Sequence, residues 1–239
     1  MSVAKKISGE IMRMPEGNTF KYQELGISRA EYAAATKAIE RLIKNGIIQR
    51  ASTGLFFKPK KTIFGLLNPD ESDLLRPYLF EGKKRIAYIT GVTLYNKLGL
   101  TTQVPKNIKI ASRDKRIAVM IGNMKVTSVK SYAEIDNNNY QILEILDALK
   151  DFKTIPDINK SEVLKNLSKR VEKIENTKSL FRLILKYPPR VRALAGALLE
   201  WLGKSEGLEI IKNSLNPLSV FELGLNTLQL PSIENWNIN

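Results

Sequence analysis

The apolar positions at the start of the chain recur every three or four residues, the spacing of one face of a helix. This pattern predicts a first helix over residues 3–14, and Pro15 ends it. Its apolar residues are Val3, Ile7, Ile11 and Met14. A single helical turn is predicted next, over residues 22–25, closed by Gly26.

A serine and a glutamate mark the start of the next predicted helix. Ser28 and Glu31 have the spacing of a capping box, in which each side chain binds the backbone amide of the other residue. The helix is predicted to run to Asn45, because Gly46 suits the left-handed position beyond a helix C-terminus. One face of it is apolar and is predicted to pack on the first helix: Tyr32, Ala35, Ile39, Leu42 and Ile43.

Short strands complete the pattern of the N-terminal quarter. Residues 19–20 predict a strand, and residues 47–51 and 55–58 predict a hairpin whose turn is Ser52-Thr53-Gly54. Helix, strand, helical turn, capped helix and hairpin follow one another with few spare residues. This order predicts a winged helix-turn-helix, a module that usually places its second helix in the DNA major groove.

The remaining chain predicts an α+β protein. Short strands and helices alternate through residues 62–135, and helical spacing dominates over residues 136–239. We therefore predict an N-terminal winged helix-turn-helix over residues 1–61, a mixed α+β domain and a helical C-terminal part; the last two form either one domain or two. The asparagine-bearing end, from Asn226, is expected to be loosely ordered.

Composition adds a partner class and removes several chemistries. The net charge is +14, and residues 1–61 carry half of this excess with 12 basic and 5 acidic side chains. Such a balance suits a polyanion such as DNA, although a lysine-rich surface also serves solubility. Cysteine and histidine are absent, which excludes disulfides, Cys/His zinc sites and His-based catalysis. The sequence has neither a membrane-spanning run nor a secretory signal at its start, so we expect a cytoplasmic protein.

The predicted DNA-binding residues lie on the polar face of the capped helix and on the hairpin. Small alanines would let the helix approach base edges, and the cations would reach phosphates or guanine. Alanine is also the best helix former and exposed cations are ordinary, so a solvated helix face is the alternative. The candidates are Ser28, Arg29, Ala30, Ala33, Ala34, Lys37, Arg41 and Lys44 on the helix, with Arg50, Ser52, Thr53 and Lys58 on the hairpin.

The sequence contains only weak matches to the residue patterns of known catalytic sites. Pro69-Asp70 and Glu81-Gly82-Lys83 imitate the spacing of metal-dependent nucleases, in which two carboxylates hold a divalent ion and the lysine steadies the attacking water. Asp70, however, has the pattern of a helix cap. No glycine-rich phosphate loop and no nucleotidyltransferase signature occur. We predict a protein that is not an enzyme and has neither a metal nor a cofactor, with a winged-helix-guided nuclease and a protein-binding winged helix as alternatives.

Three segments resemble a known family, the AbiEi-like antitoxins of type IV toxin–antitoxin (abortive infection) systems. They are Leu25–Ser28 leading into Ala38–Ile48, the hairpin segment Gly54–Phe56, and Ala87–Thr101 with the strands after it. The Tyr88–Thr101 part is the more specific, because many regulators share the winged helix. The likeness spans roughly residues 3–200 and does not include the last 35 or so.

This resemblance implies a two-part protein. Its N-terminal domain represses its own operon by binding an operator in double-stranded DNA near the promoter. Its C-terminal domain takes part in opposing a separately encoded nucleotidyltransferase toxin, without a required stable complex. We transfer only the role of the winged helix, onto residues 28–44 and 50–58; no residue is assigned to antitoxicity.

Overall fold

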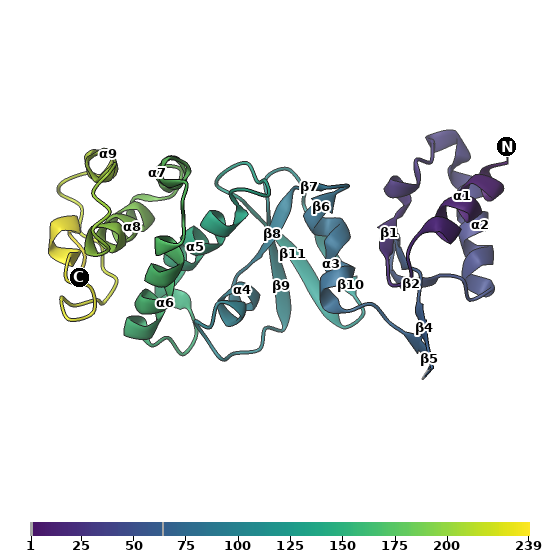
Figure 1. Ribbon diagram of the computed structural model, residues 1–239, viewed down its shortest axis with the longest axis horizontal. Helices are drawn as coiled ribbons and strands as arrows, with labels where there is room; N and C mark the ends of the chain where they lie inside the picture. Colours follow the sequence, from purple (N-terminus) through teal and green to yellow (C-terminus); the bar gives the residue numbers. More distant parts are fainter. Residues whose placement is uncertain (1, 64) are drawn as a thin grey trace. The chain divides into compact units, whose positions relative to one another are not determined.

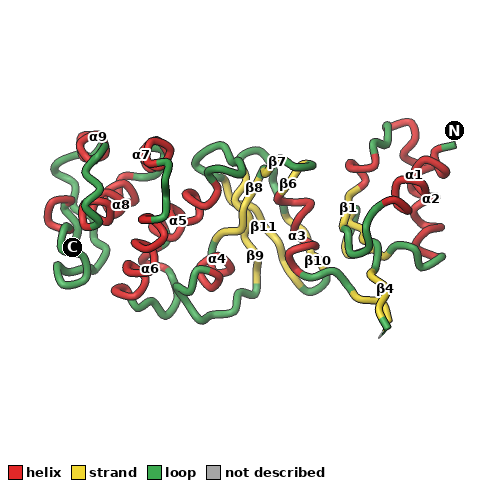
Figure 2. Tube along the Cα trace, viewed as in Figure 1, coloured by secondary structure: helices red, strands yellow, loops and turns green. Residues whose placement is uncertain are grey.

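The computed structural model describes residues 2–63 and 65–239, and the chain divides into two compact units (Figures 1 and 2). The first unit holds Met1–Lys83 with Val119–Lys125, and the second holds Lys84–Ala118 with Val126–Asn239. Helices and antiparallel strands occur together, which confirms the predicted α+β class. Within the described ranges, every helix is too short or too polar to cross a lipid bilayer.

The first unit begins with the elements that the sequence predicts, here called the N-terminal module. They are α1 (Val3–Arg13), β1 (Thr19–Lys21), the 3-10 turns η1 (Tyr22–Leu25) and η2 (Arg29–Glu31), α2 (Tyr32–Lys44), β2 (Gln49–Ser52) and β3 (Leu55–Phe57). The strands form an antiparallel sheet in the order β1-β3-β2, with Phe20 opposite Phe56. The order of helices and strands follows the sequence prediction. Each hairpin strand is one residue shorter than predicted: β2 begins at Gln49 and extends to Ser52, and β3 ends before Lys58.

A small apolar core holds the module together. Helices α1 and α2 lie side by side in the purple part of Figure 1, and Ile7 and Ile11 of α1 are fully buried with Ile39 of α2. Phe20 and Phe56 close the core from the sheet, with ring centres 5.8 Å apart. The period of the apolar residues therefore identified Ile7, Ile11 and Ile39 as core residues correctly.

The first unit continues beyond residue 61, where the sequence predicts a domain boundary. A second hairpin, β4 (Lys60–Thr62) with β5 (Gly65–Leu67), is followed by α3 (Glu71–Leu79). Two side chains of β1 bind carbonyl groups of α3: Thr19 Oγ1 donates to Asp73 O at 2.6 Å, and Lys21 Nζ donates to Pro77 O at 2.7 Å. These long-range bonds attach α3 to the N-terminal module.

The second unit combines strands with a set of helices. A short strand pair, β6 (Phe80–Glu81) with β7 (Lys84–Arg85), precedes β8 (Ala87–Thr90), which pairs antiparallel with β9 (Asn107–Ser112). These two strands belong to a sheet of order β10-β11-β9-β8, in which most of β10 (Ala118–Ile121) and the start of β11 (Met124–Lys130) are grouped with the first unit. The helices of the second unit are α4 (Val92–Lys97), α5 (Tyr140–Lys150), α6 (Lys160–Glu172), α7 (Thr177–Ile184), α8 (Pro189–Trp201) and α9 (Leu208–Asn213), with 3-10 turns η3 (Phe152–Thr154) and η4 (Ile233–Trp236).

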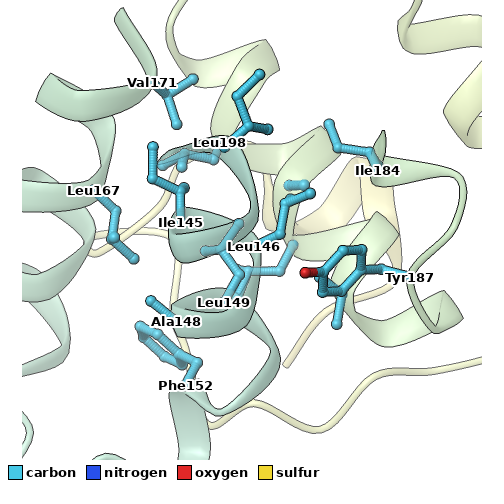
Figure 3. Close-up of a cluster of buried hydrophobic side chains, with 14 of the residues drawn as sticks. Ile145, Leu146, Ala148, Leu149, Phe152, Leu167, Val171, Ile184, Tyr187 and Leu198 are labelled. Carbon is cyan, nitrogen blue, oxygen red and sulfur yellow. The ribbon is translucent and has the colours of Figure 1, made fainter. Parts of the chain in front are cut away.

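Helix α5 is the central element of this unit. All residues from Ile142 to Leu149 are buried, so both its apolar and its polar side chains lie in the interior. Figure 3 shows Ile145 and Leu149 of α5 among side chains from α6, α7 and α8. A helix buried on every side needs partners for its polar residues as well as for its apolar ones.

Asp147 of α5 meets this need through a buried hydrogen-bond cluster. Its Oδ2 accepts from the Tyr88 hydroxyl at 3.0 Å and from Thr90 Oγ1 at 2.7 Å. Its Oδ1 accepts from the Tyr187 hydroxyl, which points toward α5 in Figure 3, at 3.1 Å, and from Lys150 Nζ at 3.4 Å. One carboxylate thus joins β8, α5 and the segment between α7 and α8.

The tyrosines of this cluster predict loss of stability at alkaline pH. Burial raises the pKa of the Tyr88, Tyr95 and Tyr187 hydroxyls far above its ordinary value of about 10, and nearby Asp147 or Asp151 raises it further. The folded state then keeps protons that the unfolded chain releases. Stability from these groups is present below pH ~10 and falls as the pH rises above it. Tyrosinate absorbance should show three tyrosines ionising only as tryptophan fluorescence reports unfolding; their free titration in the folded protein would contradict this.

The C-terminal segment is packed, which corrects the expectation of loose order from Asn226. Leu230, Ile233, Trp236 and Ile238 are all buried. The Trp236 indole Nε1 donates to Glu200 Oε2 of α8 at 2.5 Å, and Ser232 Oγ donates to Ala197 O at 2.6 Å. These apolar residues hold the segment in the core, although its composition is rich in asparagine.

Gly196 of α8 makes room for Trp236. A Cβ at residue 196 would lie 2.3 Å from the indole ring, a distance that requires a shift of a large buried side chain. We therefore expect Gly196→Ala to lower the free energy of unfolding by about 1–3 kcal/mol, although alanine favours helices. Urea unfolding followed by fluorescence measures this, and Trp236→Leu should reduce the loss, with Trp201 as the remaining reporter. Equal effects of Gly196→Ala with and without Trp236→Leu would disprove the contact.

Candidate nucleic-acid interface

The start of α2 is fixed by a clasp between Ser28 and Glu31. Glu31 Oε2 accepts from the Ser28 backbone N–H at 3.0 Å and from the Ser28 hydroxyl at 2.6 Å. Hydrogen bonds from Ser28 lower the pKa of the Glu31 carboxyl, so it stays ionised at neutral pH. The predicted capping box is confirmed, with the difference that residues 29–31 form a 3-10 turn before α2 begins.

The end of α2 also follows the sequence prediction. Gly46 has φ +69°, the left-handed conformation expected beyond a helix C-terminus, and the Ile47 N–H donates to Leu42 O at 3.0 Å. Both ends of the helix are therefore set by local residues, which fixes the direction in which each side chain points.

The buried face of α2 differs from the prediction at two positions. Ala35, Ile39 and Leu42 are buried as expected, and Ala38 joins them. Tyr32 is 54% exposed, so the prediction that it packs on α1 is wrong. The centre of its ring lies 5.3 Å from the ring centre of Tyr22 instead. This arrangement leaves one side of the amphipathic ring exposed to water.

The opposite face of α2 points to solvent along its whole length. Every helix residue predicted to bind DNA is exposed: Ser28, Arg29, Ala30, Ala33, Ala34, Lys37, Arg41 and Lys44. Between residues 2–63 and 65–239, no hydrogen bond or ion pair engages the side chain of Lys37 or Arg41. One carboxylate, Glu40, lies at the margin, about 60° around the helix from Lys37. We call the eight residues the basic face.

Only some of the hairpin residues that were predicted to contact DNA are exposed on the hairpin. Arg50 is exposed, with its guanidinium carbon 5.6 Å from the Phe56 ring centre, and Thr53 is exposed at the turn before Gly54. Ser52 does not fit a DNA contact, because its hydroxyl oxygen is buried behind a bulge in the strand pairing. The structure therefore leaves Arg50 and Thr53 as hairpin residues that a duplex can reach.

Lys58 also requires a correction. Its Nζ donates to Met12 O and to Met14 O, both at 2.9 Å, so the ammonium satisfies carbonyl groups at the C-terminal end of α1. A cation there also complements the helix dipole. Lys58 thus joins β3 to α1 and does not extend toward a ligand.

The second hairpin, formed by β4 and β5, was not predicted from the sequence. Lys60 and Lys61 of β4 are exposed beside an equally exposed β5, and Ile63 is 94% exposed at the turn. Gly65, with φ +112°, is the turn signal that could have revealed this hairpin between two short β-forming runs.

The nuclease-like residues do not assemble into a site. Asp70 caps α3: its Oδ1 accepts from the Asp73 N–H at 2.8 Å and from Ser72 Oγ at 2.7 Å, which lowers the pKa of its carboxyl. Glu81 lies beyond the other end of this nine-residue helix, about 14 Å of axial rise away. Among the described residues, no cluster of acidic side chains could hold a metal ion.

Comparison with known proteins places the chain by family and by fold. The RV2827C protein from Mycobacterium tuberculosis has a similar structure, with a TM-score of 0.51 over 90% of this chain and 81% of that one, at 14% sequence identity. This is a likeness of fold alone. No curated protein sequence matches the chain. Residues 6–180 match a family of unknown function, DUF6088, and since the match covers most of the sequence, the chain belongs to that family.

Proposed function

We propose that the N-terminal module is a winged helix-turn-helix that binds double-stranded DNA, and that the protein is the antitoxin and autorepressor of a type IV toxin–antitoxin operon. In this proposal the protein works in the cytoplasm, where its operator is, and is not an enzyme. The basic face of α2 enters the major groove, and the β2–β3 hairpin lies along the sugar-phosphate backbone.

One observation carries the DNA-binding part: Lys37 and Arg41 point outward beside small alanines on a helix that is fixed at both ends. Ala30, Ala33 and Ala34 leave the backbone close to whatever the helix meets, so that cations on the same face can reach base edges or phosphates. The excess of seven positive charges in residues 1–61 supports a polyanionic partner.

The antitoxin part has a separate basis, the resemblance of residues 88–101 and of the N-terminal segments to AbiEi-like proteins. The proposed functional partner is a nucleotidyltransferase toxin from a neighbouring gene. Co-expression tests this part: the chain should restore the growth of cells that produce the neighbouring toxin. Continued growth arrest, with both proteins produced, would reject it and leave the DNA-binding part standing.

A mobility-shift experiment tests the DNA-binding part. Full-length protein should bind duplex DNA from upstream of its own gene more tightly than random duplex of equal length at ~150 mM salt, where non-specific binding is weak. Equal affinity for the two duplexes would reject an operator-binding repressor.

A further inference from the structure

A pocket of about 500 Å³ opens in the second unit among α4, α5, α6 and the start of α7. Its size falls within the range of small-ligand sites. It combines two carboxylates, the exposed Glu175 and one that is buried, with three cations, amide groups and apolar side chains, and none of these belongs to the proposed DNA-binding surface.

The buried carboxylate is Glu144, which lines the pocket from the middle of α5. Glu144 is only 9% exposed, and within residues 2–63 and 65–239 its carboxylate makes no hydrogen bond or ion pair. Desolvation raises the pKa of this carboxyl, an effect that the more distant charges of Lys97, Arg85 and Arg170 partly oppose. The carboxylate oxygens are not among the fully enclosed side-chain atoms that lack a partner, so they open into the pocket and can accept from a ligand there.

The cations lie toward the solvent side of the same pocket. Arg170 is half-buried and held in place: its Nε donates to Asn166 Oδ1 at 3.1 Å, and Nη2 donates to Leu98 O at 3.4 Å. Lys97 and Lys173 are exposed, and no ion pair in the described chain engages them. Three cations with free N–H groups form a receptor for an anion such as phosphate.

Flat and apolar groups line the same pocket. Tyr140 lines the pocket, and the Arg85 guanidinium carbon, 3.8 Å from its ring centre, holds the ring in place. Ile142, Ile145 and Ile174 add apolar surface. A ligand that fits this set needs a planar apolar body, hydrogen-bond donors at one end and negative charge at the other.

We propose that this pocket binds a guanine nucleotide, with the base edge on Glu144 and the phosphate on Lys97, Arg170 and Lys173. Guanine presents two adjacent donors, N1–H and the exocyclic amine, which match the two oxygens of one carboxylate. Uracil presents carbonyl acceptors on either side of its N3–H, and these would repel the carboxylate. This inference is independent of DNA binding and of the toxin–antitoxin proposal.

Calorimetric titration of the full-length protein with GMP, UMP and inorganic phosphate tests the pocket. GMP should bind, phosphate should bind more weakly, and UMP, which carries the same phosphate, should bind no more tightly than inorganic phosphate. Glu144→Gln should weaken GMP binding at least ~10-fold, because charged acceptors make the stronger hydrogen bonds. Lys173→Gln should weaken GMP and phosphate alike, whereas Lys165→Gln, an exposed lysine elsewhere on α6, should change neither.

Three results would overturn the proposal: no saturable binding of GMP, equal affinity of GMP for Glu144→Gln and the unaltered protein, or phosphate binding as tightly as GMP. A stability measurement shows whether a loss of GMP binding comes from unfolding. Glu144→Gln removes a partly desolvated charge, so we expect it to unfold at the same or a higher urea concentration. Tryptophan fluorescence measures this, because both tryptophans, Trp201 and Trp236, lie in the unit that holds the pocket.

Discussion

Asp147→Ala is expected to lower the free energy of unfolding of the second unit by about 3–5 kcal/mol, because several buried polar groups lose their partner at once. The substitution leaves the Tyr88, Thr90 and Tyr187 hydroxyls without their acceptor, and Lys150 keeps only Asp151, at 3.7 Å, as an ion-pair partner. These groups come from elements far apart in the chain, so the loss should affect the whole unit.

Tryptophan fluorescence in urea gives the measurement, since it reports on the second unit. Asp147→Asn keeps an acceptor and should cost less than Asp147→Ala. Asp114→Ala, at an exposed turn, should stay within about 0.5 kcal/mol of the unaltered protein. If Asp147→Ala matched Asp114→Ala, the cluster would not be what holds α5 in place.

The sequence predicted the elements whose causes are local. The Ser28–Glu31 clasp, Gly46 and the apolar period of α1 act within a few residues, so that capping and periodicity rules found them.

Features that depend on distant partners were missed. Lys58 looks like a free cation in sequence, but the carbonyls that it binds lie 44 and 46 residues earlier. Asp147 reads as an ordinary helix residue, although Tyr88 and Thr90 lie 59 and 57 residues away from it. Likewise, nothing in the period of α5 distinguishes Glu144, whose interest arises only from the pocket that other helices complete.

The combined substitution Lys37→Ala and Arg41→Ala is expected to reduce operator affinity by about 1–3 kcal/mol per cation if each reaches a base edge. If they contact only phosphates, the loss should be uniform across sequences, and the dependence of affinity on salt should fall by about one counterion per cation. Fluorescence anisotropy over a series of salt concentrations separates these cases.

The matched control is Lys5→Ala with Arg13→Ala. It removes the same charge from exposed positions of α1 in the same unit, and we expect a much smaller loss of affinity. Glu40→Gln should strengthen binding, because it removes the carboxylate beside the basic face. Equal losses in the two double variants would mean that general charge, and not the face of α2, determines binding.

Photo-crosslinking tests most directly whether the exposed face of α2 contacts the duplex. A photoreactive side chain at Ala34, on the basic face, should form covalent adducts with upstream duplex DNA. The same group at Met12, which is 56% exposed on α1, should form few or none. Adducts from Met12 in the absence of adducts from Ala34 would contradict the account.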